Sequence, residues 1–468
     1  MRCTALVGAS RTDRVSCAGA FAALTSLAAA SAASGQLPGW STIELQARSG
    51  GPASFNLPPG AIFTSGTPAI GGQGQIAFRL ITVGSSGVAG LWSGGGGTGQ
   101  VVYAAPDQDP VITDPSINAF GEVVFDQYDL FSSDGLFRYD PKLEEAFVEI
   151  APGGPLGIDL FGSPQINDAG AIAFRAAIGS GQAHVVVVAG VQSVLAGTPS
   201  VMPGSPYSFL FTPSLNNAGQ VASKVQRASG GNEIRVFTGG GDSVLIAADS
   251  AANPRSPFQS FGNGVGLVDD GRVAFIASIA GTGGDRGVFL SDGIETTEIA
   301  REHDGTVTEI EFFNPSANAQ GLVAFRGRDA DGLRAIFVGD GVEIARVVGD
   351  RSAVPTDLGP AQIDRPDFSP VFGGNPRLNA RGDLAFNASL TPLGNPTTSW
   401  GSGIFVAYAD TDRPGDLDGN GVVDGADLTL MLAAWGACGE CVKCPSDLDG
   451  DCAVGGADLA VLLANWGD

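Results

Sequence analysis

The chain has 468 residues, of which 49 are acidic and 25 are basic, and its net charge is −24 at pH 7. Nucleic acids and anionic membranes repel so acidic a chain, which excludes both as expected partners. The 70 glycines, the 28 prolines and many short runs of Val, Ile, Ala and Phe indicate an all-β protein with many turns, and the length accommodates one large domain and one small one.

The first 32 residues have the pattern of a secretory signal peptide. Three arginines precede an apolar stretch over residues 15–30, and Ala30-Ser31-Ala32 fits a cleavage site. A membrane anchor is the alternative, but the apolar stretch is shorter than a full span and ends in small polar residues. The sequence therefore predicts a secreted or extracellular protein, with cell-surface association as an option, and it predicts no transmembrane segment.

A motif recurs through residues 41–408, an Asn-x-x-Gly turn followed by a Val/Ile-Ala-Phe strand. Its seven copies contain Gly74, Gly121, Gly170, Gly219, Gly271, Gly321 and Gly382. By their numbers, these glycines follow one another after 47, 49, 49, 52, 50 and 61 residues, and such a period indicates a propeller or an array. Each unit holds four strand-like runs. We therefore predict a seven-bladed β-propeller whose repeated Phe residues pack in the core.

The two ends of this region complement each other. The seventh repeat stops after Phe405-Val406-Ala407 without a fourth strand, whereas residues 42–47 precede the first repeat and resemble a fourth strand. We therefore expect the N-terminal strand to complete the last blade and close the ring, which leaves no open edge. An open solenoid is the alternative, but neither end carries a polar capping repeat.

Residues 416–468, which follow a linker at 409–415, contain two acidic loops, each followed by a short apolar helix pattern. In such loops oxygen side chains at positions 1, 3, 5, 9 and 12 and a backbone carbonyl at position 7 form the ligand set that Ca²⁺ prefers. The first loop offers Asp416, Asp418, Asn420, Val422, Asp424 and Asp427, and the second offers Asp447, Asp449, Asp451, Ala453 and Asp458. We expect two calcium sites. The second should be weaker, because Cys452 replaces the glycine of position 6 and Gly455 removes the side chain of position 9.

Cysteine usage agrees with export. Cys3 and Cys17 would leave with the signal peptide, and the other cysteines lie in the C-terminal module: Cys438, Cys441, Cys444 and Cys452. Two disulfides are the favoured interpretation, and the sequence leaves all three possible pairings open. The C-x-x-C-x-x-C spacing leaves a zinc site as the alternative.

Residues 414–467 resemble a type I dockerin module, through the duplicated Asp-rich loops with Asp at position 12 and the Leu-rich segments that follow. The resemblance implies binding of a cohesin-like protein through a face built from both helices. Trp435 and Trp466 end these helices, and we favour a role in packing the two halves together over a role in that face. Residues 42–408 resemble tandem Asn-x-x-Gly-x-x-Ala-Phe repeat proteins that bacteria export, which implies an architecture but no activity.

No catalytic or cofactor-binding residue can be assigned from the sequence. The two histidines, His184 in a strand-like run and His303 in an acidic loop, have no nucleophile at a recognisable spacing. Acids from different blades could meet in space, but we favour a solvated turn role for each candidate: Asp126, Asp168, Asp269 and Asp285.

The sequence thus predicts a secreted, non-catalytic binding or scaffold propeller with a glycan or protein ligand. Its calcium-dependent module would tether it to a cohesin-like or cell-surface partner. A dockerin-linked carbohydrate-active enzyme, either a hydrolase or a lyase, is the first alternative. A structural surface-layer component is the second.

Overall fold

The structure is a computed structural model, which describes residues 37–466 except 52, 64, 85–86, 109, 130–131, 240, 366–369, 411–413, 419–422, 439–443 and 449–450. The chain divides into two units, Met1–Gly35 and Gln36–Asp468. The predicted signal peptide at 1–32 lies outside the described residues, and the account below concerns the second unit alone.

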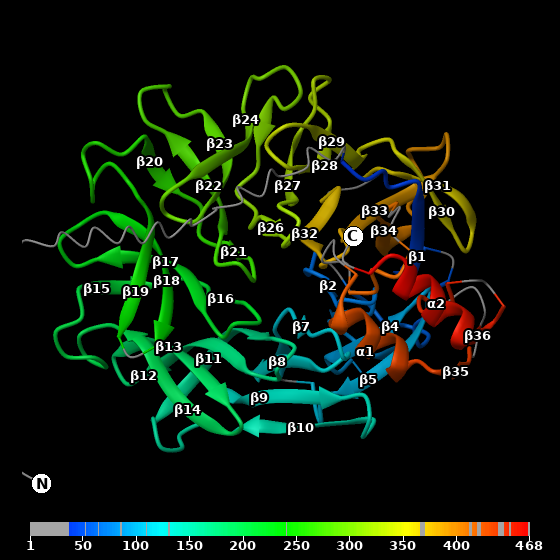
Figure 1. The fold of residues 1–468 in the computed structure, drawn as a ribbon, viewed down its shortest axis with the longest axis horizontal. Coiled ribbons are helices and arrows are strands. Elements are labelled where there is room, and N and C mark those ends of the chain that lie inside the picture. Colours follow the sequence, from blue (N-terminus) through cyan, green and yellow to red (C-terminus); the bar gives the residue numbers. More distant parts are fainter. Residues whose placement is uncertain are drawn as a thin grey trace, which may run out of the picture. The chain divides into compact units, whose positions relative to one another are not determined.

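Seven antiparallel sheets follow one another around a central channel (Figure 1). The first three blades contain β2 (Ala69–Ile70), β3 (Ile76–Leu80), β4 (Gly90–Gly95) and β5 (Thr98–Ala104); β6 (Val111–Ile112), β7 (Ser116–Ile117), β8 (Val123–Tyr128), β9 (Ser133–Asp140) and β10 (Glu145–Ile150); and β11 (Ile158–Ile166), β12 (Ile172–Ile178), β13 (Gly181–Val188) and β14 (Val191–Gly197). These sheets confirm the propeller architecture that the repeats predict.

The remaining blades continue around the ring, and the last one also takes the first strand of the chain. They contain β15 (Tyr207–Leu210), β16 (Ser214–Leu215), β17 (Val221–Arg227), β18 (Asn232–Gly239) and β19 (Asp242–Ala248); β20 (Phe258–Phe261), β21 (Gly266–Leu267), β22 (Val273–Ile279), β23 (Arg286–Ser291) and β24 (Thr296–Arg301); β25 (Glu309–Ile310), β26 (Ser316–Ala317), β27 (Val323–Arg328), β28 (Arg334–Gly339) and β29 (Ile344–Gly349); and β30 (Ala353–Thr356), β31 (Gly359–Ile363), β32 (Phe372–Leu378), β33 (Leu384–Pro392), β34 (Gly401–Tyr408) and β1 (Thr42–Ser49).

The repeated Phe residues lie in the core, as predicted, and most of them pair with an aromatic residue on the next strand. In the fifth blade Phe275 lies opposite Phe289, with ring centroids 5.6 Å apart in a stacked arrangement. The same cross-strand stack joins Phe78 to Trp92, Phe125 to Phe137, Phe325 to Phe337 and Phe386 to Phe405. Each pair contributes about 0.5–1.5 kcal/mol beyond its area burial, which explains the aromatic ends of the second and third strands.

Strand β1 closes the ring. It pairs antiparallel with β34 in a register that runs from Thr42 opposite Tyr408 to Ser49 opposite Ser402. The N-terminal strand therefore becomes the outer strand of the last blade, and the prediction of closure is confirmed. The structure rules out the open solenoid, because blade seven holds both ends of the repeat region.

The seventh blade also contains a hairpin that the repeat pattern does not reveal. Strand β30 pairs with β31, and β31 pairs in turn with β33, so the sheet order is β1-β34-β33-β31-β30. This extra hairpin accounts for much of the longer step of 61 residues between Gly321 and Gly382.

The C-terminal module consists of two helices and a two-stranded ribbon, α1 (Gly425–Ala433), β35 (Gly436–Ala437), β36 (Ala453–Val454) and α2 (Gly456–Ala464). Its small core contains Leu417, Val423, Met431, Val454 and Leu462. The tryptophans that end the two helices lie outside this buried core and are about half exposed, at 48% and 45%. Leucine, valine and methionine side chains, rather than the two tryptophans, hold the halves together.

A disulfide joins Cys438 to Cys444, whose Cα atoms lie 5.9 Å apart. Cys452 is also disulfide-bonded, and Cys441 lies outside the described residues. Oxidised sulfurs do not bind zinc as thiolates do, so the zinc alternative is wrong. The bridge stabilises a module whose core is too small to do so alone.

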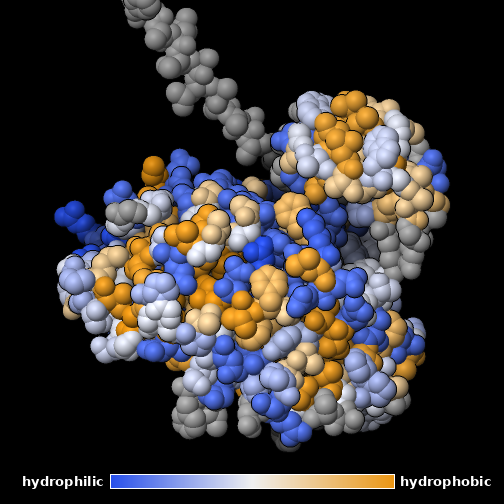
Figure 2. All heavy atoms as spheres, turned by 90° about the horizontal axis from the view of Figure 1, so that it is seen from below, coloured by the Kyte–Doolittle hydropathy of each residue, from blue (hydrophilic) through white to orange (hydrophobic). Residues whose placement is uncertain are grey.

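The outer rim of the propeller is chemically mixed. Figure 2 shows hydrophobic residues interspersed with hydrophilic ones along this edge, and the exposed apolar side chains of the chain include Leu160, Val188 and Val191. Scattered apolar residues of this kind are normal for a protein surface. Within the part of the chain that the structure describes, no helix is both long and apolar enough to cross a membrane.

Candidate functional site

The first acidic loop brings three of its predicted ligands together. Carboxylate oxygens of Asp416, Asp418 and Asp427 all lie within 4.8 Å of one another. Asp424 caps α1 instead, because its Oδ1 accepts a hydrogen bond from the Ala426 amide at 2.7 Å. The other two predicted ligands, Asn420 and Val422, lie outside the described residues. Three adjacent carboxylates repel one another, and an oxygen-only donor set of this kind fits a hard cation.

Asp427 is the best-positioned member of this group. Its side chain is fully buried, its Oδ1 accepts hydrogen bonds from the amides of Leu417 at 2.6 Å and Asp418 at 2.9 Å, and its Oδ2 accepts one from the Asp424 amide at 2.8 Å. The amides use both lone-pair sites of Oδ1 and one of Oδ2, so Oδ2 keeps a site for a cation. The short helix α1 thus presents a fixed, buried carboxylate to the first two acids of the loop.

The second loop repeats the same support. Asp458 is fully buried, and its two oxygens accept hydrogen bonds from the Leu448 amide at 2.7 Å and the Gly455 amide at 2.6 Å. Asp447 accepts bonds from the amides of Asp451 at 3.1 Å and Cys452 at 2.9 Å. Among the described residues no cluster of three acids forms in this loop, and Asp449 lies outside them.

Two backbone features of the second loop bear on its predicted calcium site. Cys452 adopts a φ of 72°, a left-handed conformation that costs a non-glycine residue about 1–2 kcal/mol. Ala453, the predicted carbonyl ligand, lies in β36 opposite Ala437. The weaker second site therefore stays a prediction.

In the propeller, the asparagines of the repeat form a ring of hydrogen bonds from blade to blade. Asn167 accepts a bond from the Ala171 amide at 2.9 Å within its own turn and donates one from Nδ2 to the Asn216 carbonyl of the next blade at 3.0 Å. Equivalent cross-blade bonds of 3.0 to 3.2 Å start from Asn118, Asn216, Asn318 and Asn379. The repeated residue is therefore a structural link, a role that the sequence pattern did not reveal.

Two blades lack this asparagine, and a neighbouring side chain replaces it. Gly71 and Val268 occupy the position. Four residues later, the Gln75 Nε2 atom donates to a turn carbonyl of the next blade at 3.4 Å, and the Arg272 Nη2 atom does the same at 3.0 Å. All seven blade interfaces near the turns thus carry a cross-blade hydrogen bond.

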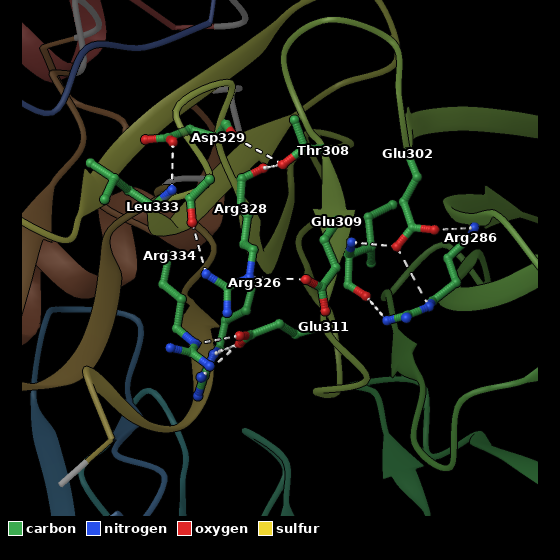
Figure 3. A network of polar contacts seen from close by, with 12 residues as sticks. Arg286, Glu302, Thr308, Glu309, Glu311, Arg326, Arg328, Asp329, Leu333 and Arg334 are labelled. Carbon is green, nitrogen blue, oxygen red and sulfur yellow. Dashed lines mark hydrogen bonds and ion pairs between the residues drawn. The ribbon is translucent and has the colours of Figure 1, made fainter. Parts of the chain in front are cut away.

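Long basic side chains form further cross-blade contacts nearer the other face. Arg326 donates from Nη1 to the carbonyls of Phe372 at 3.1 Å and Gly374 at 2.8 Å, while its Nη2 lies 2.7 Å from Glu311. Figure 3 shows Glu311 shared between Arg326 and Arg334, whose Nε lies 2.8 Å from that carboxylate. Arg286 contacts both Glu302 and the Ile310 carbonyl in the same network. These charges hold blades together.

Two of the candidate acids keep the turn role that we favoured. Asp168 and Asp269 both accept hydrogen bonds from the Asn217 side-chain amide, at 2.7 and 3.1 Å, and both accept a backbone amide of a neighbouring blade at 2.7 Å. Asp285 lies 3.7 Å from His303, whose side chain is largely exposed.

The expectation for Asp126 is wrong, because this residue is buried within β8 and does not lie in a solvated turn. Only 2% of it is exposed, and its Oδ1 accepts a hydrogen bond from Ser133 Oγ at 2.5 Å. Burial and the charge of Asp134 raise the pKa of Asp126 to about 7, against the lowering effect of Ser133. Strand alternation places the Asp126 side chain on the opposite face of β8 from Phe125, and both side chains are buried.

His184 is a core residue of β13. It is fully buried, its Nε2 lies 3.0 Å from the Phe211 carbonyl, and its Nδ1 has no hydrogen-bond partner among the described residues. Burial lowers the pKa of His184 to about 4, so the ring is neutral at physiological pH. The neutral ring packs edge-on against Phe237 in the core, with centroids 5.8 Å apart.

Comparisons with solved structures return weak likenesses to proteins of different functions. An oligogalacturonate lyase in complex with manganese has 11% identity and a TM-score of 0.48, and the match covers 79% of this chain and 96% of that one. A putative TolB from Agrobacterium tumefaciens has 13% identity and a TM-score of 0.36, over 66% and 92%. The fucose-recognising Aleuria aurantia lectin, a six-bladed propeller, has 13% identity and a TM-score of 0.34, over 62% and 97%. Since all three TM-scores lie below 0.5, these likenesses carry no functional argument.

No curated protein matches the chain. A family model does match, over residues 18–332, which is more than half of the 468 residues and ends before the acidic loops. The chain therefore belongs to the family of unknown function DUF7453.

Proposed function

We propose that the protein is a secreted, non-catalytic binding or scaffold propeller, tethered through a calcium-dependent C-terminal module to a cohesin-like or cell-surface partner. The observation that carries the proposal is the cluster of Asp416, Asp418 and Asp427, in which three carboxylates converge within 4.8 Å. Calcium would neutralise their repulsion and take its ligands from side chains that backbone amides already hold in place.

The surface of the module supports the tethering part of the proposal. Leu432 and Trp435 are 54% and 48% exposed, and their equivalents in the second half, Leu463 and Trp466, are 52% and 45% exposed. The same apolar pair thus lies at the same place in both halves of the duplicated sequence. Exposed large apolar residues at matched positions are suited to bind a partner protein, and calcium would act by holding the two helices in place.

The propeller supports the non-catalytic part. Many of the charged and amide side chains at its blade interfaces are engaged in hydrogen bonds between blades, as Asn167 and Arg326 illustrate. Such groups fix the ring, and their donors are not available to a substrate. A scaffold or binding role is the function that this arrangement supports best.

Affinity capture with the full chain tests the proposal. The bait is incubated with culture supernatant and envelope extract, with calcium or with a chelator. We expect calcium-dependent capture of a partner by the natural chain, and loss of that partner with Asp427→Asn and with the double variant Leu432→Asp/Leu463→Asp. Ile294→Asp, at a position that is 92% exposed on the propeller, is the matched surface control and should keep the partner.

Capture that is indifferent to the chelator and to both module variants would contradict the tethering function. Turnover of polysaccharides by the purified chain would contradict the non-catalytic role instead. The two parts of the proposal can therefore fail separately.

A further inference from the structure

One level of the central channel is lined by seven equivalent residues, one from each blade. Each lies two positions before the asparagine of the repeat or its replacement: Ala69, Ser116, Gln165, Ser214, Gly266, Ser316 and Arg377. They line a cavity of about 180 Å³, and no acidic residue is among its lining. A single guanidinium is therefore the only charged group in the lining, in a protein whose net charge is −24.

Three serines of this ring have defined orientations. The Oγ atoms of Ser116, Ser214 and Ser316 accept hydrogen bonds from backbone amides of the next blade at 3.2, 3.0 and 3.0 Å. An amide bond occupies an acceptor site of the hydroxyl and leaves its hydrogen free to donate. Within the described part of the chain no acceptor is found for these three hydrogens, so the serines can donate to a group in the cavity.

Arg377 lies on β32, opposite Ala385. Among the described residues its guanidinium has no hydrogen bond or ion pair. Asp114 is the acid whose charge reaches it, but Asp114 is already engaged by Arg79 at 2.7 Å and by the Thr67 amide at 3.1 Å. Burial lowers the pKa of Arg377, yet a guanidinium keeps its charge in proteins. Arg377 is only partly buried, and a guanidinium that lines a channel without an acid at the same level favours an anion as its counter-ion.

We propose that the ring around Arg377 is a binding site for an oxyanion, either a free inorganic ion or the carboxylate of a larger ligand that enters the channel. A guanidinium presents a planar pair of donors that matches carboxylate and sulfate oxygens, and the serine hydroxyls add donors from other blades. The cavity of about 180 Å³ holds roughly six waters at about 30 Å³ each, which is enough for one such group. Among the described residues, none from the C-terminal module lines this cavity.

Calorimetric titration of the full chain with sodium sulfate, sodium acetate and sodium glucuronate, in a buffer low in other anions, tests the proposal. We expect one saturable site per chain and an affinity loss of about tenfold or more with Arg377→Gln, since charge-assisted hydrogen bonds are lost. Arg255→Gln removes an exposed guanidinium of the same size and should leave the affinity unchanged. Arg377→Lys keeps the charge without the planar donor pair and should bind with intermediate affinity, which maintains the test if Arg377→Gln does not fold.

The three probes also distinguish a free inorganic ion from the carboxylate of a larger ligand as the bound oxyanion. Sulfate binding that acetate and glucuronate do not displace identifies a free inorganic ion as the ligand. Displacement of sulfate by the carboxylates identifies a carboxylate ligand. The absence of saturable binding with all three probes overturns the proposal, as does binding that Arg377→Gln leaves unchanged.

Discussion

The guanidinium of Arg48 forms two parallel ion-pair contacts with the carboxylate of Asp357, 309 residues away, with Nε–Oδ1 at 2.8 Å and Nη2–Oδ2 at 2.9 Å. The Arg48 side chain is fully buried, and its Nη1 donates to the carbonyls of Gly50 at 2.6 Å and Trp400 at 3.0 Å. Arg48 lies on β1 and Asp357 lies in the turn between β30 and β31. The pair therefore fastens the strand that closes the ring to the extra hairpin of the last blade.

Substitution of Arg48 by Met should open this closure. The variant leaves the Asp357 carboxylate and two carbonyls without their donor, and loss of one partner of a buried pair typically costs about 3–5 kcal/mol. Chemical denaturation should show this loss of unfolding free energy, and Arg365→Met, at an exposed position, should not. An unchanged stability of Arg48→Met would mean that the pair does not hold the ring closed.

The asparagine ring predicts a second stability effect. Asn167→Ala removes both the bond to the Ala171 amide and the bond to the Asn216 carbonyl, and buried groups without partners cost about 1–3 kcal/mol each. We expect a loss of about 2–4 kcal/mol in unfolding free energy. Asn167→Asp keeps the acceptor of the turn bond but lacks the donor of the cross-blade bond. If Asn167→Asp loses less unfolding free energy than Asn167→Ala at neutral pH, the turn bond contributes most of the stability. The cross-blade bond would then contribute little.

Val268 occupies the position of the repeated asparagine in the fifth blade, so introducing asparagine there tests the role of the ring in the opposite direction. Val268→Asn should add the asparagine donor of the other blades to the bond that Arg272 already provides. It should therefore cost less than about 1 kcal/mol, although it places an amide at a buried site. Val273→Asn, at an equally buried valine in β22 of the same blade, is the matched control and should cost about 3 kcal/mol. Equal losses in thermal denaturation of the two variants would contradict the ring as the reason for the repeated asparagine.

Asp126 predicts a pH dependence of stability. Its folded pKa of about 7 lies above the ordinary value of 3.8, so the folded state holds the proton more tightly than the unfolded state. Stability should therefore fall as the pH rises between these two values, by at most about 4 kcal/mol at 1.36 kcal/mol per pH unit. Asp126→Asn, which is neutral at every pH, should flatten this part of the profile in urea denaturation between pH 4 and pH 8, whereas Asp331→Asn at an exposed turn should not. Parallel profiles for natural chain and Asp126→Asn would mean that Asp126 is ionised in the fold.

The sequence predicts the ring and its closure because both depend on local patterns. The period of the turns, the Phe residues and the strand-like segment at residues 42–47 are visible without any long-range information. The Arg48–Asp357 pair and the hairpin β30–β31 are not, since periodicity does not show which distant side chains meet. The spacing within the first loop predicts the cluster of Asp416, Asp418 and Asp427, but not that Asp424 caps the helix.

The sequence shows the charge of Arg377 but not its place in the channel. Alignment of the seven repeats on the asparagine leaves small or uncharged residues two positions earlier in six copies and Arg377 in the last. Only the closed ring shows that this position faces the channel. In the channel, the charge of Arg377 indicates an anion site.

Calorimetric titration of the full chain with Ca²⁺ is the most direct test of calcium binding by the C-terminal module. We predict two binding events of unequal affinity, with the tighter one lost in Asp416→Ala/Asp427→Ala and kept in Asp331→Asn. Circular dichroism of the natural chain should also show a gain of helix on calcium addition that the double variant lacks, because binding energy becomes folding energy. No calcium binding by the natural chain, or unchanged affinity and circular dichroism in the double variant, would contradict the claim.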